Sequence, residues 1–111
     1  RIEISGTQTT AGVVNVLLIK RSTANTGGTS STPTICPHDS TNNVATGVVR
    51  AYTANPASLG TSVGTVRATK TFLSTTTGQP QILAFEFASK FVEQEIVLRG
   101  STQVFAVNLK V

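Results

Sequence analysis

The sequence predicts an all-β protein, and two observations carry that prediction. First, only 13% of the 111 residues are charged, about half the share in an average soluble domain. Threonine and valine are abundant instead, and their β-branched side chains fit a pleated strand better than a helix. Second, hydropathy alternates with a period of two through most apolar segments, as in half-buried strands. An antiparallel β-sandwich of the jelly-roll kind is the architecture we expect, with a small β-barrel as the alternative.

The alternating segments, separated by glycine, proline and asparagine turns, give seven expected strands. These are Arg1–Ser5, Gly12–Arg21, Ala45–Tyr52, Ser62–Leu73, Gln81–Phe87, Gln94–Gly100 and Thr102–Val111. The short spacing around Gly100 and Ser101 predicts that the last two strands form a hairpin. Residues 89–95 are the one stretch with helical character, and they are too few for a stable isolated helix.

The alternation also predicts which side chains face the core. The segment Gly12–Arg21 is apolar on both faces, which is typical of a central strand. In Gln81–Phe87 we expect the leucine and the two phenylalanines to point inward. In Ser62–Leu73 we expect an apolar inner row and a polar outer row. The inner row is Val66, Ala68 and Phe72, interrupted by Lys70, and the outer row is Thr65, Arg67, Thr69 and Thr71.

The length of the chain fits a single domain spanning residues 1–111. Because the chain starts at Arg1 and stops at Val111 inside an alternating pattern, we expect it to be part of a slightly longer protein. No apolar run reaches the roughly 18 residues of a membrane span, so no membrane partner is expected. The net charge is +4, but the nine basic residues are spread along the chain. A nucleic-acid partner is not expected, because such proteins usually cluster their basic residues.

Residues 22–44 interrupt the strand pattern with a long polar segment, and residues 53–62 continue its character. Loops longer than about 12 to 15 residues are uncommon in compact domains unless they are functional or disordered. Ordering such a loop costs conformational entropy, so we expect it to be mobile or held by a neighbouring molecule. The residues that we expect in the interaction loops are Arg21, Asn25, Gly27, Gly28, Pro33, Pro37, His38, Asp39, Tyr52, Asn55 and Pro56.

The motif TICPHDS contains the chain's only cysteine, histidine and aspartate: Cys36, His38 and Asp39. In an extended segment Cys36 and His38 would share a face, but zinc requires a third and usually a fourth ligand. A Cys–His catalytic pair also needs a third, orienting group. We therefore expect a stiff loop in which Asp39-Ser40 caps a turn or a short helix, and no catalytic, metal or cofactor site. The threonines of Ser62–Leu73 would give a flat sugar- or ice-binding array, but Tyr52 is the only tyrosine available for stacking and tryptophan is absent.

Several stretches resemble small proteins encoded by tailed bacteriophages and prophages. The similar segments are IKRSTANTGGTSSTPTICPHDSTNNVATGVVRAYTANPASLGTSVGTVR and IVLRGSTQVFAVNL. The resemblance extends from about Lys20 onward and departs at Ile35-Cys36, where the similar proteins have small residues. Those proteins continue past the position of Leu109 into another strand.

The resemblance implies a virion component: a capsid decoration or cement protein, a fibre or spike base, or a minor tail piece. Its partners would be copies of itself, with a trimer as one form of the homo-oligomer, and major capsid or tail proteins. A receptor- or carbohydrate-binding module at a fibre or tail tip is the alternative, and a lysin fragment with enzymatic activity is a third.

Overall fold

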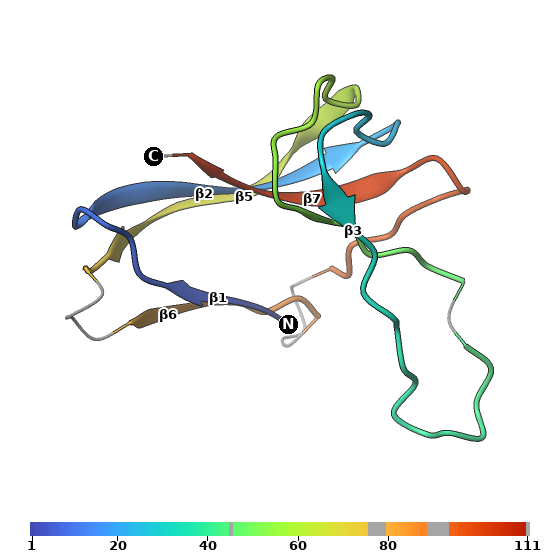
Figure 1. Cartoon of the computed structure of the whole chain (residues 1–111). Helices are drawn as coiled ribbons and strands as arrows, with labels where there is room; N and C mark the ends of the chain where they lie inside the picture. The colour runs from blue at the N-terminus through green and yellow to red at the C-terminus, as the bar shows by residue number, and fades with distance from the viewer. Residues whose placement is uncertain (45, 76–79, 89–93, 111) are drawn as a thin grey trace. The chain divides into compact units, whose positions relative to one another are not determined.

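The computed structural model describes residues 1–44, 46–75, 80–88 and 94–110, and these residues confirm the all-β prediction. They contain no helix, and therefore none long and apolar enough to cross a membrane. The strands are β1 (Ile2–Gly6), β2 (Gly12–Arg21), β3 (Ser30–Ser31), β4 (Ala51–Tyr52), β5 (Ser62–Leu73), β6 (Gln81–Phe85) and β7 (Val104–Lys110). All of their pairings are antiparallel, in three separate sheets of order β1-β6, β5-β2-β7 and β3-β4 (Figure 1).

The chain divides into two compact units. The first, which we call the sheet unit, comprises Arg1–Thr23 and Thr61–Val111 and holds β1, β2, β5, β6 and β7. The second, which we call the loop unit, is Ala24–Gly60 and holds β3 and β4. The loop unit is therefore an insertion in the sequence between the paired strands β2 and β5.

Strand β2 is the centre of the sheet unit, as its two apolar faces predict. It pairs with β5 on one side and with β7 on the other. Its residues Val14, Val16 and Leu18 are almost completely buried. Val16 and Leu18 pack with Phe85 of β6, and Ile2, Ile4 and Leu83 of β1 and β6 pack against that cluster. The two-stranded sheet β1-β6 faces the three-stranded sheet (Figure 1). Burial of each such aliphatic side chain contributes roughly 1.5–3 kcal/mol, so this cluster is the main apolar support of the unit.

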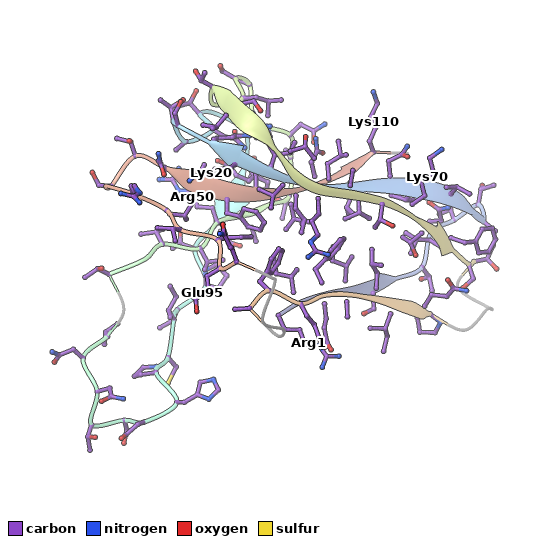
Figure 2. All side chains as sticks on the ribbon, turned by 180° about the vertical axis from the view of Figure 1, so that it is seen from behind. Arg1, Lys20, Arg50, Lys70, Glu95 and Lys110 are labelled. Atoms are coloured by element: carbon purple, nitrogen blue, oxygen red, sulfur yellow. The ribbon has the colours of Figure 1, made fainter. Side chains whose placement is uncertain are left out.

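The face prediction for β5 is wrong. Thr69 lies directly opposite Val16 and Thr71 opposite Val14, and opposed residues in an antiparallel pair share a face. The two threonines therefore lie on the core side, where they are half-buried, whereas Phe72 is 47% exposed. Lys70, together with Lys110 of β7, projects from the side away from β1 and β6 (Figure 2).

The reason is that a period of two sorts side chains into two rows without saying which row faces inward. The register with β2 makes that choice in β5. For Gln81–Phe87 the prediction is confirmed, since Leu83, Phe85 and Phe87 all contact the core and Glu86 is exposed.

The predicted strand over Gln94–Gly100 is also wrong, and the hairpin with it. Residues 94–99 form no strand. Side chains form hydrogen bonds with backbone groups that strand pairing would otherwise use. Lys20 Nζ donates to the Val97 carbonyl at 2.7 Å, and Gln103 Oε1 accepts from Arg99 N–H at 2.8 Å. The chain then turns at Gly100, whose φ of 73° favours glycine.

The remaining strands differ from prediction mainly in length. β1 and β7 lie within a residue or two of the expected segments, and β6 ends at Phe85. Of the strand expected over residues 45–52, Ala51–Tyr52 pairs and the described residues 46–50 do not, while the short strand β3 was not predicted. Residues 89–93 of the helical stretch, Ala45 and Val111 lie outside the described residues, and residues 94 and 95 are not helical.

Candidate functional site

The loop unit begins and ends with backbone pairing between the two polar segments that the sequence singled out. Thr26 and Ser58 exchange two hydrogen bonds, of 3.0 and 3.1 Å. The Thr29 carbonyl accepts from Thr53 N–H at 2.9 Å and Ala54 N–H at 3.2 Å. Next along the chain, β3 pairs with β4. We call residues 24–31 and 51–60 the base. The expectation that these segments are either mobile or held by a neighbour is therefore wrong for the base, because the segments hold each other.

Two of the expected interaction residues have structural roles in the base. Tyr52 is half-buried, and its hydroxyl donates to the Asn25 carbonyl at 3.3 Å. The Asn25 side chain accepts the Gly60 N–H through Oδ1 at 2.9 Å. Asn25 therefore links the two arms of the base, residues 24–31 and residues 51–60, through both its backbone and its side chain.

Gly27 and Gly28 allow the arms of the base to approach closely. Both have positive φ, of 69° and 75°. A Cβ at Gly28 would lie 2.6 Å from the Asn55 carbonyl oxygen, and one at Gly27 would lie 2.7 Å from Ala57 Cβ. Neither position accepts a larger residue without moving the opposite arm. Asn55 is exposed beside this contact, and Pro56 is half-buried.

Between the arms of the base, residues 32–50 form an open loop that we call the ribbon (Figure 1). None of its described residues belongs to a strand. The ribbon contains a hydrogen-bonded turn at Asp39. The Asp39 Oδ1 accepts from Thr41 N–H at 2.9 Å and from the Thr41 hydroxyl at 2.7 Å. Asn42 N–H also donates to the Asp39 carbonyl at 3.1 Å. The two hydrogen bonds to Oδ1 lower the pKa of the Asp39 carboxyl, and the bond from the Thr41 hydroxyl has the larger effect. Asp39 thus caps a turn, as its position predicts.

The surface of the ribbon is polar, nearly uncharged and dotted with exposed apolar groups. Its charged residues are Asp39 and Arg50. Pro33 and His38 are exposed, while Ile35 and Pro37 are half-buried. The side chains of three valines, Val44, Val48 and Val49, are each more than half exposed. Such a surface suits contact with another polypeptide better than contact with a strongly charged ligand.

The sequence reasoning missed those valines. It assigned Val48 and Val49 to a paired strand, where their side chains would be covered. Gly47 directly before them, and the two adjacent valines that break the alternation, were the signals against that assignment.

The TICPHDS motif lies on the ribbon. Cys36 is exposed, and its thiol donates weakly to the Pro37 carbonyl at 3.5 Å. In the part of the chain that the structure describes, no three histidine, cysteine, aspartate or glutamate side chains are grouped to hold a metal ion.

Arg21 differs from the other expected interaction residues because it belongs to the sheet unit. It is the last residue of β2, opposite Val104 and Ser62, and is 6% exposed. The other ten expected residues belong to the loop unit. Arg21 is thus a buried residue of the sheet unit in this chain.

The threonine array on β5 is not formed. Thr69 and Thr71 lie on the core side, and Thr65 is exposed beyond a register shift, opposite Ile19. The three hydroxyls therefore do not make one flat exposed row, and the ribbon is the candidate site that remains. No family model, curated protein or solved structure matches the chain.

Proposed function

We propose that the protein is a structural component of a tailed-bacteriophage particle, a capsid decoration or fibre-base protein that acts by adhesion. Its partners in this proposal are copies of itself and the major capsid or tail proteins. The proposal rests on the resemblance of residues from about Lys20 onward to small phage proteins, and on the chemistry of the ribbon. We also propose that β1-β6 and β5-β2-β7 are the two layers of a jelly-roll-like sandwich, since both contribute to one core.

The observation that carries the proposal is the contrast between the base and the ribbon. The base is held by paired backbone groups, while the described part of the ribbon presents exposed side chains and is ordered around Asp39. A fixed base limits the conformations that the ribbon loses on binding, which lowers the entropy cost of association.

The chemistry of the ribbon suits a protein partner. Its amide and hydroxyl groups can exchange hydrogen bonds with a backbone, and its exposed valines can bury apolar area. A weak contact of this kind becomes firm when many copies bind one repetitive shell, because each bound copy raises the local concentration of the next contact.

The test replaces residues 33–49 with a glycine-serine linker of equal length and adds the protein back to particles that lack it. We expect the copies bound per particle to fall at least tenfold, because the contact groups are removed while the base is kept. Quantitative mass spectrometry of purified particles measures the occupancy. Ile82→Ser is the matched control, since Ile82 is 71% exposed on β6, outside the ribbon.

Unchanged occupancy of the linker variant would contradict adhesion through the ribbon. An occupancy of only a few copies per particle, with glycan binding by the isolated protein that the linker abolishes, would favour the receptor- or carbohydrate-binding alternative.

A further inference from the structure

Strand β7 is an edge strand whose core-side residues are only partly covered. Val107 lies opposite Leu18 and Leu109 lies opposite Val16, so both share a face with fully buried residues. Yet the side chains of Val107 and Leu109 are 45% and 52% exposed, and neither belongs to the cluster around Phe85. The apolar row of the three-stranded sheet therefore continues past the part that β1 and β6 cover.

The free edge of β7 also lacks the features that usually prevent strand addition. Its seven residues contain no proline, and the row Phe105, Val107 and Leu109 carries no charge. Its pairing with β2 is regular throughout, whereas the pairing of β2 with β5 has two register shifts. Within the described ranges, β7 forms a ladder with β2 alone. A long, regular edge of this kind favours pairing with another strand.

We propose that two copies of the chain join by antiparallel pairing of β7 with β7 about a two-fold axis at Val107. The two three-stranded sheets then form one continuous sheet. Val107 lies opposite the partner's Val107, and Phe105 lies opposite the partner's Leu109. On the other face, Lys110 lies opposite the partner's Val104, and Asn108 lies opposite the partner's Ala106.

The strand's own sequence argues for a second copy as the occupant. This register uses the whole of β7 and keeps its apolar row continuous on the core side, where cross-strand pairs stabilise a sheet. A shift by one residue would turn one apolar row to the opposite face. Lys110 is the only charged residue of the strand and meets a valine, so the pairing brings no like charges together. The contact uses the sheet unit alone and does not depend on the proposed role of the ribbon.

The test uses complementary charges at the symmetry axis. Val107→Lys places two ammonium groups opposite each other, and Val107→Glu places two carboxylates. Sedimentation velocity should give the mass of two chains for the wild type and of one chain for each variant. An equimolar mixture of the variants should regain the mass of two chains, because lysine then meets glutamate. Val66→Lys should remain dimeric as the matched control, since Val66 is 43% exposed on the opposite edge strand β5.

A single-chain mass for the wild type at about 100 µM would overturn the proposal, because such weak affinity would leave the edge unpaired. So would a two-chain mass for both folded single variants, or a monomeric mixture of folded variants. A measurement on the wild type alone covers the case in which a variant fails to fold: amide exchange in β7 should slow as protein concentration rises, and exchange that is independent of concentration overturns the proposal. The glycine-serine ribbon variant should stay dimeric, so this contact and the function of the ribbon can fail separately.

Discussion

Asp39 shows how one side chain can order a segment that has no strand or helix of its own. Its carboxylate accepts two hydrogen bonds from Thr41, and both favour the ionised form, so the carboxyl has a lowered pKa. Because the pKa of Asp39 is lower in the folded chain than in the unfolded chain, the ionised carboxylate stabilises the turn at pH values above the ordinary aspartate pKa. That support is lost as the pH falls through the lowered pKa of Asp39.

Thr41→Val should therefore raise the pKa of Asp39 toward the ordinary value of about 3.9. The rise should be partial, because the backbone N–H of Thr41 remains. Carbon-detected NMR titration of the Asp39 carboxyl measures it, with Ser40→Ala as a control that removes a neighbouring hydroxyl. An unchanged pKa in Thr41→Val would show that the hydroxyl bond does not support the turn in solution.

At the scale of elements, β2 determines most of the sheet unit. Its apolar character on both faces makes it central, and its register decides which row of β5 and β7 faces the core. Val13 and Val16 have the same side chain in the same strand, but Val13 is 54% exposed and Val16 is fully buried. They therefore separate the effect of burial from that of strand propensity.

Val16→Ala should lower the free energy of unfolding by about 2 kcal/mol, since it removes buried methyl groups and leaves a cavity. Val13→Ala should cost less than about 1 kcal/mol, because it loses mainly β-propensity. Chemical denaturation followed by circular dichroism measures both. Equal costs would mean that the core does not lie on the side of β2 that holds Val16.

At the scale of the whole molecule, the chain builds one unit inside the sequence of the other. The ends of the loop unit meet where β2 and β5 are already joined: Ser22 N–H donates to the Thr61 carbonyl, and Thr61 N–H donates to Thr23 Oγ1, each at 2.9 Å. Insertions of this kind are tolerated where chain ends lie close together. Among the described residues, the core cluster of the sheet unit includes none from the loop unit.

Replacing Ala24–Gly60 with Asn-Gly-Gly should therefore leave a sheet unit that unfolds cooperatively, because a short turn can join the two strands. Thermal denaturation followed by circular dichroism tests this. Val16→Ala in the shortened chain is the control, and it should cost the same as in the full chain if the core is intact. A shortened chain without a cooperative transition would contradict the independence of the sheet unit.

The sequence by itself determined the all-β class, the central position of β2, the inward row of β6 and the turn at Asp39. Each of these depends on local properties: strand propensity, the hydropathy of one segment, or a side chain that bonds to its neighbours. The same reasoning located the long polar segments, and with them most of the candidate site.

Tertiary structure alone decided which row of β5 faces the core, that residues 94–99 form no strand, and that the two polar segments pair with each other at the base. These outcomes depend on which distant backbone groups meet. A period of two carries no information about the partner strand, and loop composition does not say which other loop will satisfy its hydrogen bonds. The burial of Arg21 and the exposure of Val107 and Leu109 have the same origin, because the exposure of a side chain depends on which other residues the fold places next to it.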